Sequence, residues 1–246
     1  MREKAARRQR AVLEEILRRF VEKNEPIGSK QLELGCSSAT IRNDMAALEE
    51  RGLIHKAHLS GGRLPTAKAF RWQIDEFLAE NVLLLRPTPE SAPDESPLQQ
   101  RVSRAVAELA ESSQMLAFAT LSRRESILFG LSRFLSQPEF SDPLKISEII
   151  DLLENRARFA DFIESLELGE GLRVFIGAEN SLPILAPTSL LAARWRSAGE
   201  EGALGLLGPV RMNYPRQLAT LKGILEKFAL VETPLELPAA RGFFLG

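Results

Sequence analysis

The chain has 246 residues, of which 44% are hydrophobic and 26% are charged, with a formal net charge of −1. This length suits two modest domains or one large domain, and the apolar content is sufficient for a packed core. The single cysteine, Cys36, excludes an intramolecular disulfide and favours a reducing compartment. The Arg- and Glu-rich N-terminus is unlike a signal peptide, and no apolar run approaches the roughly 20 residues that span a bilayer. We therefore expect a soluble, cytoplasmic protein.

The near-neutral total conceals an uneven distribution of charge. Residues 1–72 carry 15 Lys and Arg residues against 9 Asp and Glu residues, so the rest of the chain is acidic. A basic module joined to an acidic body is typical of proteins that contact nucleic acid at one end. The excess is modest, so the motifs have to support this interpretation.

The stretch from Ser37 to Gly52 has the pattern of a recognition helix. Ser37 or Ser38 can cap its start, and Gly52 suits the left-handed position after a helix. Ile41, Met45 and Leu48 recur at helical spacing and form one apolar stripe. The opposite face carries small and polar residues, as expected of a helix that enters the major groove.

The outer face of this helix also carries side chains suited to reading bases. Asn43 suits adenine and Arg42 suits guanine, because each can make two hydrogen bonds to its base edge. An ordinary amphipathic surface helix would also have a polar outer face, so the flanking sequence has to decide between the two interpretations.

The flanking sequence favours a winged helix-turn-helix. A helix over residues 5–23 is followed by turn residues, a short helix over 30–34 that Ser29 would cap, and a tight turn at Gly35 and Cys36. After Gly52, the run 53–59 resembles a strand, residues 60–63 form a hairpin turn, and 64–66 return as a wing. Both histidines lie in this wing, but no third ligand accompanies them, so we expect no metal site.

The rest of the chain predicts a second domain. A helix expected over 67–84 completes the first domain, residues 1–85. In this helix we expect Trp72 to cover the side away from the inner face, or a partner subunit. The segment 86–97 contains four prolines and three acidic residues and is a linker by composition. Residues 98–230 would then form the second domain, and 231–246 a C-terminal tail.

Hydrophobic periodicity in 98–230 predicts one helix, two strands, a helix, three strands and a final helix. The expected helices cover 98–113, 143–166 and a last segment from Pro215, with a loop at 131–142. The expected strands cover 115–121, 126–130, 172–176, 189–196 and 202–207. This order predicts an α+β domain with one antiparallel sheet.

Three runs together resemble the heat-inducible transcription repressor HrcA family of bacteria. They are residues 37–50 with the wing 60–66, the loop 134–142, and the pair 174–180 and 205–214. The resemblance implies a multidomain α+β protein with an N-terminal winged helix-turn-helix and a GAF-like regulatory and dimerisation domain. Between the helix near Leu109 and the strand near Phe129, family members usually hold more of the GAF-like domain and an inserted dimerisation domain. In this chain the same region consists only of residues 112–128, which is too short for either. The chain would therefore be a shortened member, with a reduced GAF-like fold.

The resemblance further implies a function and partners. It implies a homodimeric repressor of heat-shock (chaperone) operons that binds an inverted-repeat operator, is released on heat stress, and depends on the chaperonin for its activity. The expected DNA-binding residues are Lys30, Ser37, Ser38, Thr40, Arg42, Asn43, Lys56, His58 and Arg63.

Two alternatives remain open from the residues. The second domain could sense a small-molecule ligand through Arg211, Asn213 and Tyr214, or these residues could form a structural loop before the last helix. An enzyme is a weak alternative, because 98–230 contains no His, no Cys and no catalytic motif. We expect no catalytic residues, no metal and no cofactor.

Overall fold

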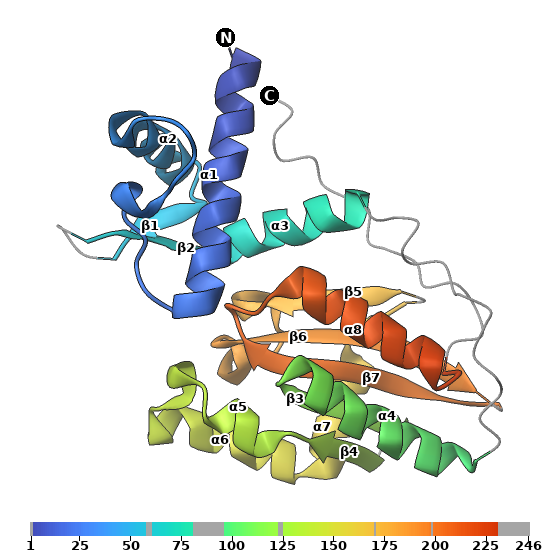
Figure 1. Ribbon diagram of the computed structural model, residues 1–246. Helices are drawn as coiled ribbons and strands as arrows, with labels where there is room; N and C mark the ends of the chain where they lie inside the picture. Colours follow the sequence, from blue (N-terminus) through green and yellow to red (C-terminus); the bar gives the residue numbers. More distant parts are fainter. Residues whose placement is uncertain are drawn as a thin grey trace. The chain divides into compact units, whose positions relative to one another are not determined.

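The computed structural model describes residues 2–57, 61–80, 96–122, 125–169, 171–197 and 199–230 (Figure 1). Its chain divides into two compact units. One unit holds the described residues up to Ala79 together with Arg211–Tyr214, and the other holds the remaining described residues. The predicted linker 86–97 lies almost entirely outside the described residues, as does the predicted tail.

The first unit has the element order of a winged helix-turn-helix. Its elements are α1 (Arg2–Lys23), the 3-10 turn η1 (Ser29–Gln31), α2 (Ser38–Glu50), β1 (Ile54–Lys56), β2 (Arg63–Pro65) and α3 (Ala67–Glu80). The two strands pair antiparallel, with Ile54 opposite Pro65, and Ile27 adds a bridge to Arg63 on the other side of β2. Helix α2 is therefore followed directly by a small sheet.

The core of this unit forms where α1 and α2 pack together. The apolar stripe of α1 has no exposed surface at Val12, Leu13, Ile16 or Leu17. The stripe predicted for α2 is buried as well, with Ile41, Met45 and Leu48 at most 3% exposed.

An ion pair joins the same two helices. The carboxylate of Asp44, whose side chain is 4% exposed, accepts hydrogen bonds from Arg8 Nε at 2.5 Å and Arg8 Nη2 at 3.1 Å. This pair raises the pKa of Arg8, chiefly through its hydrogen bond to Asp44. A charged group on the inner side of α2 is therefore neutralised by α1.

Three sequence expectations for this unit are wrong in detail. The helix expected over 30–34 is a single 3-10 turn, because the backbone of Leu32 is already extended. The residue before this turn is Gly28 rather than Ser29, and Gly28 N donates to the Gln31 side chain at 2.6 Å. Trp72 is 1% exposed and belongs to the core, so it is not a surface residue that covers the outer side.

The second unit is a five-stranded antiparallel sheet with helices on both faces (Figure 1). The strands lie in the order β4-β3-β7-β6-β5. The elements are α4 (Leu98–Ser113), β3 (Leu116–Ser122), β4 (Glu125–Phe129), α5 (Leu131–Leu135), η3 (Pro138–Phe140), α6 (Pro143–Glu154), α7 (Arg156–Ser165), β5 (Leu172–Ile176), η4 (Gly177–Glu179), η5 (Pro183–Leu185), β6 (Thr188–Ser197), β7 (Glu200–Pro209) and α8 (Tyr214–Lys227).

Alternation along the strands creates a core on each face of this sheet. Phe118 of β3 packs edge-to-face on Phe159 of α7, with ring centroids 5.2 Å apart, in a cluster that includes α6. Its neighbours Ala117 and Ala119 point to the opposite face, because successive side chains on a strand alternate, and they too are fully buried. Gly205 lies opposite Phe118 in the register of β3 and β7, where a Cβ atom would come within 2.5 Å of the Phe118 ring.

The predicted fold class is confirmed: the chain is α+β, with an N-terminal winged helix-turn-helix and an antiparallel-sheet domain. Two boundaries differ from expectation. The helix expected over 143–166 is two helices, because the Asn155 side chain accepts from Arg158 N and starts a new helix. The segment 131–142, expected as a loop, contains α5 and η3. None of the described helices is long and apolar enough to cross a membrane.

The ion pair between Arg8 and Asp44 predicts an asymmetry between two variants. Arg8→Met leaves the Asp44 carboxylate, whose side chain is 4% exposed, without its cation, so the variant should unfold at a clearly lower urea concentration. Asp44→Asn should lower this concentration by less than half as much, because Arg8 is 32% exposed and can turn to water. Urea unfolding followed by tryptophan fluorescence measures both. Arg7→Met is the control, because the pair of Arg7 with Glu3 is about 80% exposed. Equal losses for Arg8→Met and Arg7→Met would contradict the prediction.

Two glycines of the second unit predict changes of opposite sign. Gly205→Ala should lower the free energy of unfolding by about 2 kcal/mol or more, because the new methyl group would clash with Phe118 and with Leu191 O. Gly223→Ala should raise it by up to about 1 kcal/mol, because Gly223 lies within α8 with open space beside it. Thermal unfolding of both variants tests this contrast, and a stable Gly205→Ala would refute the packing described.

Candidate nucleic-acid interface

Four hydroxyl groups shape the start of the recognition helix α2. Ser37 is its N-cap: the Ser37 hydroxyl accepts from Thr40 N at 3.1 Å and lies 2.9 Å from the Thr40 hydroxyl. The Ser38 hydroxyl lies 3.0 Å from that of Ser29, which ties the helix to η1. In the free protein, these residues therefore fix where the helix begins.

The face of α2 opposite the core is open to solvent. Arg42, Asn43 and Ala46 are exposed, as the helical wheel predicts from the buried stripe behind them. Arg42 makes no hydrogen bond or ion pair with the described residues. The two side chains suited to base edges are thus presented together on one exposed helical face.

The wing is built on a close approach of two backbone segments. Arg63 N donates to Ile27 O at 2.8 Å and Ile27 N donates to Arg63 O at 2.9 Å. A Cβ atom on Gly62 would come within 2.7 Å of the Ile27 backbone, so only glycine fits there. His55 and Lys56 of β1 are both exposed, whereas His58 lies outside the described residues.

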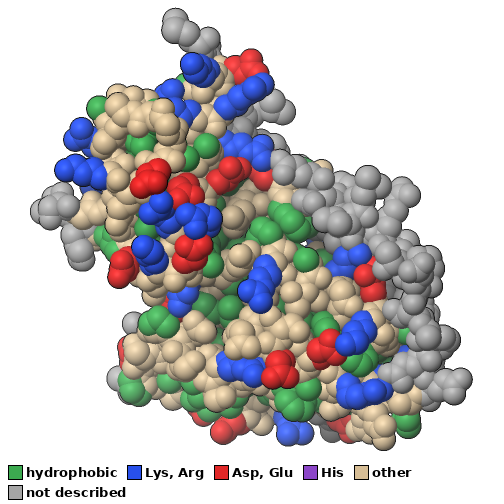
Figure 2. Space-filling model, in the orientation of Figure 1, with side chains coloured by type: hydrophobic (Ala, Val, Ile, Leu, Met, Phe, Trp, Pro, Cys, Tyr) green, Lys and Arg blue, Asp and Glu red, His purple; other side chains and the backbone are tan. Residues whose placement is uncertain are grey.

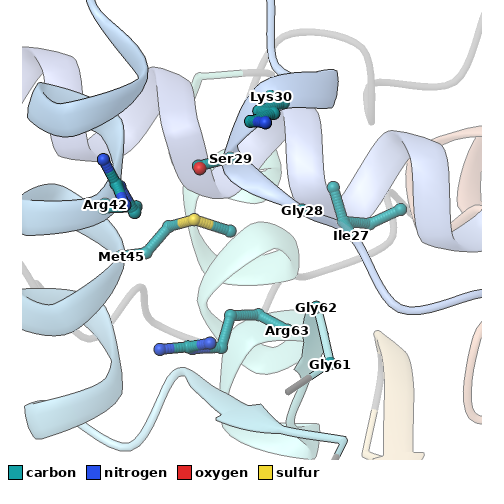
Figure 3. Close-up of a pocket in the computed structure, with 9 residues that line it drawn as sticks. All are labelled: Ile27, Gly28, Ser29, Lys30, Arg42, Met45, Gly61, Gly62 and Arg63. Carbon is teal, nitrogen blue, oxygen red and sulfur yellow. The ribbon is translucent and has the colours of Figure 1, made fainter.

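A hollow of about 380 Å³ lies between η1, α2 and the wing (Figure 3). Three of the expected DNA-binding residues line it: Lys30, Arg42 and Arg63. Arg63 Nε donates to Glu49 Oε2 of α2 at 3.0 Å. The remaining lining residues are Ile27, Gly28, Ser29, Met45, Gly61 and Gly62.

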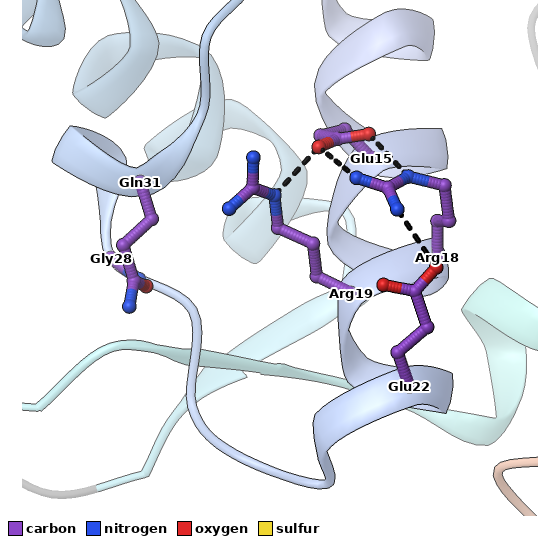
Figure 4. A network of polar contacts seen from close by, with 6 residues as sticks. All are labelled: Glu15, Arg18, Arg19, Glu22, Gly28 and Gln31. Atoms are coloured by element: carbon purple, nitrogen blue, oxygen red, sulfur yellow. Dashed lines mark hydrogen bonds and ion pairs between the residues drawn. The ribbon is translucent and has the colours of Figure 1, made fainter.

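The arginines of α1 are mostly committed to acidic neighbours. Figure 4 shows Arg18 and Arg19 both bonded to Glu15, while Arg18 also reaches Glu22. The Arg18 hydrogen bond is the largest influence on Glu15 and lowers its pKa to about 2, against an opposing effect of burial. Blue and red side chains are accordingly interleaved over this unit in Figure 2. The interpretation of these arginines as phosphate contacts is therefore weaker than the basic count suggested.

Sequence reasoning missed two residues that organise this surface. Asp44 lies between Ile41, Met45 and Leu48 on the helical wheel. An acidic residue within a buried apolar stripe needs a cationic partner, so this position could have indicated the ion pair. Glu49 gave no such signal, because its link to Arg63 spans 14 residues and depends on the hairpin.

The residues proposed for ligand sensing, Arg211, Asn213 and Tyr214, belong to the first unit rather than to the second, where they were expected. Tyr214 is fully buried, whereas Asn213 is exposed. Their placement does not favour a shared polar site. Among the described residues, no cluster of three His, Cys, Asp or Glu side chains could hold a metal ion.

The comparisons with known proteins identify both units. The family model for the C-terminal domain of HrcA matches residues 83–218, more than half of the chain. The chain belongs to the HrcA family. A DeoR-like helix-turn-helix model matches residues 31–64 of this HrcA-family chain, which run from the end of η1 through α2 and β1 into β2.

A relative agrees with this assignment. The heat-inducible transcription repressor HrcA of Natranaerobius thermophilus is 24% identical over 331 residues, covering 91% of this chain and 96% of the relative. The alignment is longer than the 246 residues of this chain, so the relative carries residues without a counterpart here, as expected for a shortened member. This HrcA-family chain is a transcriptional repressor with a DNA-binding helix-turn-helix.

A solved structure shows the same fold. The crystal structure of a hypothetical protein is 20% identical to this HrcA-family chain, covers 90% of it and 97% of its own length, and has a TM-score of 0.74.

The lowered pKa of Glu15 predicts a pH-dependent loss of stability in Glu15→Gln. Above about pH 4.5, where the unfolded carboxyl is also ionised, the variant should be less stable by about 1 kcal/mol. The difference should shrink as the pH falls from 4.5 toward the folded pKa of about 2, because the wild type then loses its charge. Urea unfolding at several pH values measures the difference, with the exposed Glu3→Gln as control. A difference that is unchanged at the acid end would contradict the assignment.

Proposed function

We propose that the chain represses heat-shock (chaperone) operons by binding an inverted-repeat operator and releasing it on heat stress. The observation that carries this proposal is the exposed pair of Arg42 and Asn43 on α2, beside a wing, in a repressor of the HrcA family. A helix of this kind enters the major groove while the wing contacts the backbone.

The nine expected DNA-binding residues then divide into two groups. The groove group consists of Ser38, Thr40, Arg42 and Asn43, which lie at the start and on the outer face of α2, with the N-cap residue Ser37 beside them. The backbone group consists of Lys30, Lys56, His58 and Arg63. Lys30 and Lys56 are exposed, as phosphate contacts require.

The operator symmetry requires a homodimer, because each half of an inverted repeat takes one recognition helix. We propose that residues 98–230 supply the dimer contact, since most of them belong to the larger unit, which does not contain α2 or the wing. The chaperonin would act on folding: heat occupies the chaperonin, inactive repressor accumulates, and the operons are expressed. Only marginal stability is needed, because one or two kcal/mol change the folded population several-fold.

A footprint of the purified chain on DNA upstream of its own chaperone genes tests this function. We expect two symmetric protected segments at low temperature, loss of protection on heating, and recovery when chaperonin is added. Absence of protection at every temperature would overturn the proposal.

Two variants distinguish a residue that contacts a base from a residue that contacts a phosphate. Arg42→Ala should weaken operator binding by about 1–3 kcal/mol and relax the sequence preference at one position of each half-site, if it contacts a base. Lys56→Ala should weaken binding to all sequences alike and reduce the salt slope by about 1, because one phosphate contact is lost. Fluorescence anisotropy on operator and scrambled duplexes measures both effects. The assignments fail if neither variant changes its titration.

A further inference from the structure

The hollow between η1, α2 and the wing has cationic side chains at its wall, and none of the described residues that line it is acidic. We propose that it seats a phosphodiester group of the operator backbone, bound by the terminal nitrogens of Arg63 and by Lys30. In this proposal, Glu49 is a positioning residue that orients Arg63. The proposal rests on the proposed function, because a DNA duplex has to lie across α2 and the wing.

The backbone of Arg63 is held from both sides. It pairs with Lys56 of β1 on one side and makes two hydrogen bonds with Ile27, an isolated bridge, on the other side. Moving this residue would break both pairings. Its side chain therefore projects from a fixed point into the hollow (Figure 3).

Glu49 occupies only one edge of the Arg63 guanidinium. The single hydrogen bond runs from Nε to Glu49 Oε2, and the two terminal nitrogens have no partner among the described residues. A guanidinium is planar with five N–H donors, so a contact at Nε fixes the direction of the other four. Two parallel hydrogen bonds to one phosphate are the arrangement that arginine favours.

The rest of the lining suits the same ligand. Lys30 is exposed on η1 and makes no ion pair with the described residues, so it can add a point charge. Gly61 carries no side chain, so none stands between a sugar-phosphate backbone and the wing at this position. Arg42 reaches the hollow from α2, so a base-reading residue and a phosphate-binding residue border one space.

Replacing single phosphates of the DNA by an uncharged analogue tests the proposed phosphate site. A methylphosphonate replaces one phosphate at a time along an operator duplex that the full chain protects, and binding is measured for the wild type and Arg63→Gln. We expect one position in each half-site at which the methylphosphonate weakens operator binding by the wild type about tenfold. At that position it should not change operator binding by Arg63→Gln. Arg63→Gln should also lower the salt slope by about 0.9. Lys23→Gln, which removes a charge that is not part of this lining, is the control and should keep the penalty at that position.

The role of Glu49 is tested at the same phosphate. Glu49→Ala removes the acceptor for Arg63 Nε and should shrink the methylphosphonate penalty at that position. Glu49→Gln keeps an acceptor oxygen and should retain most of the penalty. A full penalty in Glu49→Ala, with unchanged thermal stability, would show that Glu49 does not position Arg63.

Two further outcomes would contradict the proposed phosphate site. The first is a wild type that binds the operator while no phosphate position distinguishes it from Arg63→Gln. The second is a free anion as the occupant: millimolar inorganic phosphate would raise the melting temperature of the wild type but not of Arg63→Gln, with no DNA phosphate discriminated. A wild type that protects no DNA in the footprint contradicts the proposed function instead, so the two failures are distinguishable.

Discussion

The exposed face of the recognition helix depends on one buried carboxylate. Asp44 lies on the inner side of α2 and is neutralised by two hydrogen bonds from Arg8 of α1. The apolar residues Ile41, Met45 and Leu48 turn this side of α2 toward the core. Asp44 lies on the same side, and the hydrogen bonds from Arg8 offset the cost of burying its charge. The stripe and the ion pair together set the rotation of the helix, and hence which residues face solvent.

The positive charges of the first unit that have no acidic partner among the described residues are concentrated near α2 and the wing, because arginines of α1 are paired with acidic residues. Arg18 and Arg19 of α1 are bonded to Glu15 of the same helix. By contrast, Lys30, Arg42 and Lys56 are exposed and make no ion pair with the described residues. A local field for DNA therefore arises near α2 and the wing rather than along α1. A count of basic residues does not reveal this difference, because it ignores which charges are neutralised.

Local patterns in the sequence predicted most of the fold. The stripes of α1 and α2, the cap at Ser37 and the left-handed Gly52 depend on residues close in sequence, and all are present. The break at Asn155 was missed, because the apolar pattern continues through it while the Asn side chain starts a new helix. The 3-10 turn at η1 was predicted as a longer helix, because composition alone does not show that Leu32 is extended.

The candidate site was predictable only in part. Arg42 and Asn43 follow from helical spacing, and the structure places both on the exposed face. Contacts between distant residues did not follow: Arg8 with Asp44 spans 36 residues, and Arg63 with Glu49 spans 14. Each depends on the tertiary fold, so no periodicity encodes it. These contacts decide how the helix is held and how the hollow beside it is lined.

The most direct test of the central claim is a binding-site selection from random duplexes with the full chain. The account predicts a two-fold symmetric consensus for the wild type. It also predicts that a double variant, Arg42→Ala with Asn43→Ala, loses preference at the same positions of both half-sites. An unchanged consensus from the double variant, or no enrichment with the wild type, would contradict the claim that the exposed face of α2 reads DNA.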